Sequence, residues 1–203
     1  MIVKIFVSPT DAYTIEDADK SKRKDCYYIG CDKGAYYALQ SGVSLDLALG
    51  DFDSTTDSET AYIKKHAKKV LTFPARKDFT DSYLAVSEAL KHNPEEILIY
   101  GGMGKRFDHT FANVNLLKLG PIVLLSDHTK MYILNPGQYT IDNRYGIISF
   151  FALEDVLDLS LQGFSYELKS YDLAVDDPLC VSNAGSGSVS FEEGLLLVVE
   201  SRE

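Results

Sequence analysis

Gly50-Asp51-Phe52-Asp53-Ser54 is the segment around which this chain is organised. An apolar, strand-like run precedes it, and a polar run that can begin a helix follows it. Mg²⁺ prefers oxygen ligands in octahedral geometry and commonly takes one or two carboxylates together with substrate phosphates and water. Asp51 and Asp53 can face one such ion if Phe52 points the other way, into the core. Taken alone, the segment also fits an acidic surface turn, because Gly and Asp are common turn residues.

A second polar segment, Arg76-Lys77-Asp78-Phe79-Thr80-Asp81, follows a strand predicted at 70–73. Thr80 is a natural N-cap for a helix that runs to about Lys91. Capping alone would explain Asp81, since the helix dipole favours a carboxylate in the first turn. The segment nevertheless carries more charged and hydroxyl groups than capping needs. Lys77 is a candidate phosphate partner or, alternatively, a solvated loop lysine.

A third segment, Gly101-Gly102-Met103-Gly104-Lys105-Arg106-Phe107-Asp108-His109, follows a buried strand predicted at 97–100. A glycine-rich loop between a strand and a helix can bring backbone N–H groups close to phosphates. This one is neither a P-loop nor a dinucleotide fingerprint, so its specificity is moderate. Arg106 offers a bidentate fork for phosphate oxygens. His109, taken alone, is more often a structural hydrogen-bonding residue than a catalytic one.

The order of predicted elements divides the chain near residues 126–130. Strands and helices alternate in the first part, which predicts a mainly parallel sheet with helices on its faces. The three polar segments all follow strands, and ligands of such sheets bind at that edge. The second part has turns such as Asn135-Pro136-Gly137 and no helical pattern, which predicts an all-β sandwich or barrel. We therefore expect an α/β domain at 1–127 and a β-sandwich domain at 128–203.

The individual elements are predicted as follows. Strands are expected at 2–7, 26–30, 45–49, 70–73, 97–100 and 122–126, and helices at 35–41, 58–69, 80–91 and 110–119, with a loop or irregular helix at 11–25. Short β segments are expected at 131–134, 138–141, 145–151, 157–161, 188–191 and 195–199. Strict alternation at 157–161 indicates a strand with one buried face.

Composition restricts the class of protein. The 203 residues carry a net charge of −10, with an isoelectric point near 4.8. A general nucleic-acid binder would need a basic surface, so we expect no nucleic-acid partner. The three cysteines, Cys26, Cys31 and Cys180, have no CxxC spacing and indicate reduced thiols in a cytoplasmic protein. The apolar start is too short for a signal peptide, and no run is long enough to span a bilayer.

The three polar segments, in this order and at these separations, resemble thiamine pyrophosphokinase. Asp32-Lys33-Gly34-Ala35 upstream, and Ser182-Asn183 and Gly194–Val199 downstream, are further matches to that family's pattern. The resemblance extends from about Ile29 to Ser201, and its motifs are specific only in combination. It implies transfer of a pyrophosphoryl group from ATP to the hydroxyl of thiamine, with release of AMP. It also implies a nucleotide-binding α/β domain, a β-sandwich domain that binds thiamine and supports dimerisation, and a homodimer.

The resemblance also implies roles for particular residues. Mg²⁺ would be held by Asp51, Asp53 and Asp81, with Asp78 close by. The residues expected to contact ATP are Asp32, Lys77, Thr80, Gly101, Gly102, Gly104, Arg106 and His109. Arg106 and Lys77 would stabilise charge on the phosphates. Either Asp81 or Asp108 would take the hydroxyl proton, with no choice between them, unless a metal-bound alkoxide needs no dedicated base. Ser182 and Asn183 would contact the pyrimidine ring of thiamine, unless they form an ordinary polar turn.

Two other functions are compatible with parts of the sequence. Asp51-Phe52-Asp53 also looks like the DxD motif of nucleotide-sugar glycosyltransferases, but that interpretation leaves the other two polar segments unexplained. A non-catalytic sensor of nucleotide or thiamine would keep the fold. An Asp51→Asn variant separates the possibilities, since an enzyme would lose turnover and a sensor only metal-assisted binding.

Overall fold

The computed structural model describes residues 1–7, 25–74, 76, 78–104 and 106–202. The expected loop at 11–25 therefore lies almost entirely outside the described residues, as does Lys77. The chain forms two compact units, Met1–Asp127 and His128–Glu203. Within the described part of the chain, no helix is long and apolar enough to cross a membrane.

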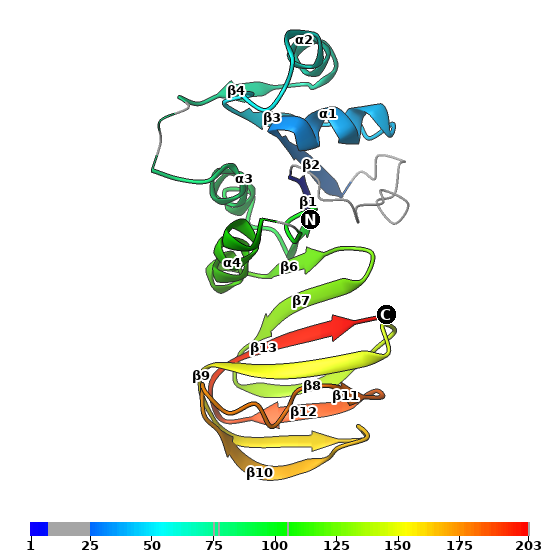
Figure 1. The fold of residues 1–203 in the computed structure, drawn as a ribbon, viewed down its shortest axis with the longest axis vertical. Helices are drawn as coiled ribbons and strands as arrows, with labels where there is room; N and C mark the ends of the chain where they lie inside the picture. Colours follow the sequence, from blue (N-terminus) through cyan, green and yellow to red (C-terminus); the bar gives the residue numbers. More distant parts are fainter. Residues whose placement is uncertain (8–24, 75, 77, 105, 203) are drawn as a thin grey trace. The chain divides into compact units, whose positions relative to one another are not determined.

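The first unit is an α/β unit built on parallel strands (Figure 1). Its strands are β1 (Ile2–Phe6), β2 (Cys26–Cys31), β3 (Leu47–Gly50), β4 (Val70–Thr72), β5 (Glu96–Tyr100) and β6 (Ile122–Leu125). Its helices are α1 (Asp32–Gln40), α2 (Asp57–His66), α3 (Asp81–Leu90) and α4 (Phe107–Leu116), with a 3₁₀ turn, η1, at Leu117–Leu119. The predicted parallel sheet is thus confirmed.

The strand order places a binding crevice at the centre of this sheet. The order is β4-β3-β2-β1-β5-β6, and each neighbouring pair is parallel. From β1 the chain proceeds to β2, β3 and β4 on one side, and then returns to β5 and β6 on the other. Connections diverge where the order reverses, so the carboxyl ends of β1 and its neighbours border an opening for a ligand.

Helices cover both faces of this sheet. Ala35 and Ile63, from α1 and α2, share a core cluster with Phe6 and Tyr28 of the strands. Successive strand residues point to opposite faces, so the equally buried Ile5 and its neighbours face the other way. Helix α3, which contacts β1, β2 and β3, packs on that second face.

Helix α1 begins earlier than the sequence predicts. The expected start is residue 35, whereas the helix starts at Asp32, immediately after β2. The close approach of Gly34 to the end of β1 permits this, since a Cβ on Gly34 would lie 2.5 Å from the Val7 carbonyl oxygen. The helix ends before Gly42, whose φ of +87° suits glycine at that position. The early start brings Asp32 to the carboxyl edge of the sheet.

The second unit consists of antiparallel strands. They are β7 (Thr129–Leu134), β8 (Gly137–Ile141), β9 (Ile147–Gln162), β10 (Leu168–Leu173), β11 (Asn183–Ala184), β12 (Gly187–Phe191) and β13 (Glu193–Ser201). The order is β7-β13-β9-β12-β8, with β10 and β11 also paired to β9. The all-β prediction is confirmed, and one buried core joins residues of β7, β8, β9, β10, β12 and β13.

The prediction of two separate strands at 145–151 and 157–161 was wrong, because both segments contribute to the single 16-residue strand β9. Its first part pairs with β13 and its second part with β12 and β10, so one strand serves two sheets. The pairing with β13 shifts register around Leu195. Gly194 stands at this irregularity, where a Cβ would lie 2.2 Å from the Asp155 carbonyl oxygen. The strands β10 and β11 were missed.

Candidate active site

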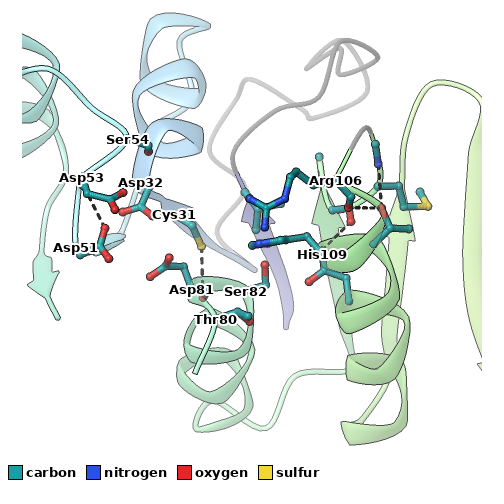
Figure 2. A pocket seen from close by; sticks show the side chains of 17 residues that line it. Cys31, Asp32, Asp51, Asp53, Ser54, Thr80, Asp81, Ser82, Arg106 and His109 are labelled. Carbon is teal, nitrogen blue, oxygen red and sulfur yellow. Dashed lines mark hydrogen bonds between the residues drawn. The ribbon is translucent and has the colours of Figure 1, made fainter. Parts of the chain in front are cut away.

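A cavity of about 430 Å³ opens at the carboxyl edge of the parallel sheet (Figure 2). All three polar segments singled out in the sequence contribute to its wall, as do the ends of β1 and β2. The lining residues are Val7, Cys31, Asp32, Asp51, Asp53, Ser54, Thr80, Asp81, Ser82, Gly101, Gly102, Met103, Gly104, Arg106, His109, Thr110 and Asn113. The predicted convergence of three loops is therefore observed.

Carboxylates gather on one side of this cavity. Oxygen atoms of Asp32, Asp51 and Asp53 all lie within 4.8 Å of one another. Asp81, the first residue of α3, lies close to them in Figure 2, and its main-chain oxygen is 3.8 Å from the Cys31 thiol. A compact set of carboxylate oxygens is the donor set that a hard cation such as Mg²⁺ prefers. These residues therefore fit a divalent cation.

The backbone between Gly50 and Asp53 is shaped to hold this cluster. Phe52 has a φ of +60° and a buried side chain, so it turns into the core and meets the condition for Asp51 and Asp53 to face one ion. Its N–H donates to Asp32 Oδ1 at 2.9 Å, and the Asp53 N–H donates to Asp51 Oδ1 at 3.1 Å. The inward aromatic ring and these two bonds leave Asp51 and Asp53 on the cavity side.

Asp32 is a buried carboxyl of the cluster with a strongly raised pKa. It is 8% exposed, and its pKa is raised from 3.8 to about 7. Burial is the largest cause, and the neighbouring carboxyls of Asp81 and Asp51 raise the pKa further, against the lowering effect of the Phe52 N–H. Burying like charges together disfavours ionisation. A divalent cation would offset that repulsion, which again agrees with a cation site.

Gly50→Ala tests whether turnover depends on the exact position of the Asp32 carboxylate. Gly50 has a φ of +144°, and a Cβ there would lie only 1.8 Å from Asp32 Oδ1. The methyl group must displace Asp32, and misplacing a catalytic group by about 1 Å can cost roughly 100-fold in rate. We expect a loss of that size in turnover. Gly42→Ala is the matched control, because its φ is also positive but no atom lies near the added methyl. Equal losses in both variants would contradict a specific clash.

The glycine loop forms another part of the wall and is braced by α4. Gly101 has a φ of +75°, which favours glycine. Asn113 Nδ2 donates to the Gly102 carbonyl oxygen at 2.7 Å, and the Gly104 N–H donates to Thr110 Oγ1 at 3.1 Å. Both ends of the loop are thereby tied to side chains of the following helix.

Arg106 and His109 lie across the cavity from the carboxylates in Figure 2. The Arg106 guanidinium donates twice to Asp108, from Nε at 3.0 Å and from an Nη at 2.6 Å. That guanidinium lowers the pKa of the Asp108 carboxyl to about 2. His109 Nε2 is 4.0 Å from Asp108. Asp108 is itself outside the cavity wall and holds the arginine in place.

Some predicted site residues are not brought together. Asp78 is exposed and does not line the cavity, and Lys77 is not among the described residues. Thr80 does line it, while its hydroxyl also caps α3 by accepting from the Tyr83 N–H.

Ser182 and Asn183, the residues expected to contact thiamine, belong to the second unit. The Asn183 amide is buried and bonds to both the N–H and the carbonyl of Tyr166.

Sequence reasoning missed several residues of the cavity wall. They are Val7, Cys31, Ser54, Ser82, Met103, Thr110 and Asn113. Cys31 and Val7 could have been found, because each stands at the end of a predicted strand that neighbours the Asp51 strand or the glycine loop. Thr110 and Asn113 carry no signal beyond their position in the first two turns of the helix after the loop.

A parallel sheet whose carboxyl edge holds a cavity lined by carboxylates, a glycine loop and an arginine defines an α/β enzyme. Residues 18–123 match the family described as "Thiamin pyrophosphokinase, catalytic domain". Residues 138–196 match the one described as "Thiamin pyrophosphokinase, vitamin B1 binding domain". The chain belongs to the thiamin pyrophosphokinase family. The glycosyltransferase interpretation of the DxD-like segment is thereby overturned.

Individual relatives support the same assignment over the whole length. The thiamine pyrophosphokinase of Bacillus subtilis (strain 168) is 36% identical over 187 residues, which is 87% of each chain. The crystal structure of a Bacillus subtilis thiamine pyrophosphokinase matches with a TM-score of 0.90 and 33% identity, covering 100% of both chains. That of the Geobacillus thermodenitrificans thiamin pyrophosphokinase matches with a TM-score of 0.88 and 30% identity, covering 100% of this chain and 98% of that one.

Proposed function

We propose that this enzyme transfers the pyrophosphoryl group of ATP to the hydroxyl of thiamine with the help of Mg²⁺, giving thiamine pyrophosphate and AMP. The observation that carries the proposal is the arrangement of the cavity in a member of this family. Carboxylates suited to a divalent cation lie on one side, and a braced glycine loop and an arginine suited to phosphate oxygens line the rest. Pyrophosphoryl transfer depends mainly on positioning and charge stabilisation, which these groups supply.

In this proposal, Asp51 and Asp53 hold the cation together with Asp32, and Asp81 borders the same position. Mg²⁺, when bound, neutralises charge on the phosphate oxygens and lowers the barrier to attack. The acidic cluster would also attract the cationic thiazolium ring of thiamine. Asp78 is less well placed than the sequence suggested, since it lies outside the cavity wall. Asp32, expected among the nucleotide contacts, lies with Asp51 and Asp53, so we add it to the proposed cation ligands.

The nucleotide would occupy the part of the cavity along Gly101–Gly104. The glycines allow phosphates or ribose to approach the backbone closely. Arg106 would stabilise charge on the transferred group or on the departing AMP, and Asp108 keeps its guanidinium oriented through two hydrogen bonds. His109 and Thr80 line the same space, and Lys77 remains a proposed phosphate partner.

Asp81 is the better candidate to take the hydroxyl proton. Asp108 is held by Arg106, and its pKa of about 2 makes it a poor base at neutral pH. It also stands outside the cavity wall, whereas Asp81 lines the cavity beside the other carboxylates. We therefore assign proton acceptance to Asp81 and orientation of Arg106 to Asp108.

The second unit, residues 128–203, would bind thiamine and support a homodimer. Its match to a vitamin B1 binding domain supports the first role, and twofold dimers are the commonest soluble oligomers. Ser182 is exposed, which suits a contact with the pyrimidine ring, whereas Asn183 would act mainly by holding the loop around Tyr166. Three free cysteines support a cytoplasmic location.

The test follows AMP and thiamine pyrophosphate in one reaction containing ATP and Mg²⁺, with and without thiamine. Both products should rise together only when thiamine is present, and EDTA should stop both. If ATP binds but no AMP appears with thiamine, the substrate assignment is wrong. A sensor or an enzyme for another acceptor alcohol would then replace it.

A further inference from the structure

Asn113 is a buried polar residue of the cavity wall to which the proposed function assigns no role. It belongs to α4 and is 4% exposed. Its Nδ2 donates to the buried Gly102 carbonyl oxygen at 2.7 Å. Its amide lies close enough to Gly102 that an added Cβ there would stand 3.3 Å from Nδ2. The side chain is therefore fixed against the glycine loop.

The hydrogen bond to Gly102 determines which atom of the Asn113 amide group is left to face the cavity. A carbonyl oxygen only accepts hydrogen bonds, so the amide must present its NH₂ group to Gly102. Among the described residues, none donates a hydrogen bond to Asn113 Oδ1, and this atom is not sealed from solvent. Because Asn113 lines the cavity, its Oδ1 offers a fixed acceptor there. A buried amide oxygen without a partner is costly unless a ligand or water supplies a donor.

The chemistry of a nucleotide limits which donor can fill this position. Phosphate oxygens are acceptors and cannot satisfy Oδ1. The glycine loop, proposed to approach the phosphates, is bonded directly to the same amide, so the donor must lie close to the phosphates. In ATP the nearest donors are the ribose hydroxyls, whereas the amine of adenine lies at the far end of the base.

We propose that Asn113 is a specificity-determining residue whose Oδ1 accepts a hydrogen bond from a ribose hydroxyl of the bound nucleotide, while its Nδ2 holds the glycine loop. The inference rests on the proposed placement of ATP in this cavity. It assigns to a residue of α4 the selection of ribonucleotides over deoxyribonucleotides.

The experiment measures dissociation constants by calorimetry, without thiamine, for the Mg²⁺ complexes of ATP, 2′-deoxyATP, 3′-deoxyATP and inosine triphosphate. One neutral hydrogen bond corresponds to about a three- to tenfold change in affinity. In the wild-type protein, the dissociation constant of one deoxy analogue should exceed that of ATP by this factor. In Asn113→Leu the ratio of the two constants should fall to about one. Comparing ratios within each variant cancels differences in the fraction of folded protein.

Asn115→Leu is the matched control, because Asn115 is an exposed residue of the same helix that bonds to the Phe111 carbonyl and does not line the cavity. It should keep the wild-type ratio. Asn113→Asp retains an acceptor and loses the NH₂ donor, so it should bind all the nucleotides more weakly yet still discriminate. If Asn113→Leu does not fold, Asn113→Ala takes its place, because it also removes the acceptor and its ratio should likewise fall to about one.

The outcomes separate this inference from the proposed function. Wild-type protein that binds ATP and both deoxy analogues equally, or Asn113→Leu that still discriminates, overturns the role of Oδ1. A change confined to the ratio for inosine triphosphate would place the adenine amine, not the ribose, at Asn113. Wild-type protein that binds no nucleotide would instead refute the proposed function itself.

Discussion

Asp51→Asn is expected to lower turnover on the order of 10³-fold while leaving the fold intact. The change removes one negative charge from a carboxylate cluster whose oxygens lie within 4.8 Å of one another. Losing a group that stabilises transition-state charge commonly costs 10²- to 10³-fold, and an amide is a weaker ligand for a hard cation. The Asn side-chain oxygen can still accept from the Asp53 N–H, so the turn should persist. Release of AMP and formation of thiamine pyrophosphate are the measurements.

Asp142→Asn provides the matched control for this change. Asp142 is an exposed carboxylate in the second unit, paired with Arg144 at 2.9 Å, and its replacement should leave turnover close to that of the wild type. Raising the Mg²⁺ concentration should partly restore the Asp51 variant if weaker cation binding is the cause. Near-normal turnover of Asp51→Asn at low Mg²⁺ would be incompatible with the proposed cation site.

Asp32→Asn is expected to separate stability from activity. Asn can keep the hydrogen bond from the Phe52 N–H through its oxygen, but it removes a buried charge from the cluster. We expect turnover to fall about 100-fold. In metal-free protein at pH 8, however, the variant should unfold several degrees above the wild type.

The pH dependence of this effect follows from the raised pKa of Asp32. The pKa of an Asp carboxyl is near 4 in an unfolded chain, whereas that of Asp32 is raised to about 7 in the folded protein. The folded state therefore binds the extra proton between these values, and stability falls as the pH rises through this window. The penalty is absent below about pH 4 and complete above about pH 7. The raised pKa of Asp32 predicts that Asp32→Asn stabilises the metal-free protein at pH 8 by an amount on the order of a few kcal/mol.

Thermal unfolding with EDTA from pH 4.5 to 8.5 measures this prediction. The advantage of Asp32→Asn should grow with pH and shrink when Mg²⁺ is added, because the cation stabilises the wild-type cluster more. Asp46→Asn is the control. Asp46 accepts from the Tyr28 N–H at 3.1 Å and pairs with Lys68 at 3.0 Å, so its replacement should destabilise the protein. A lower unfolding temperature for Asp32→Asn at pH 8 would show that its charge does not destabilise the metal-free protein.

The sequence by itself determined the fold class, the family and the edge of the sheet at which the site forms. Local patterns of apolar residues predict the strands and helices of the first unit, and Thr80 marks the start of one helix. Neighbouring parallel strands end at a common edge of the sheet. The position of three polar segments after three strands therefore sufficed to predict that they converge. Phe52, the apolar residue between two acids, turns inward, which is the condition under which the two acids can face one ion.

Only the tertiary structure decided which acids act together. Asp32 joins Asp51 because β2 and β3 are neighbours with Cys31 paired to Leu49, a contact between segments about 20 residues apart. Asp78 and Asp81 are three residues apart, yet only Asp81 lines the cavity, since it begins α3 there. The continuous strand β9 likewise depends on pairing with the distant β13. Such outcomes are set by long-range packing and by single backbone angles, such as φ of +42° at Asp32, to which local sequence patterns are insensitive.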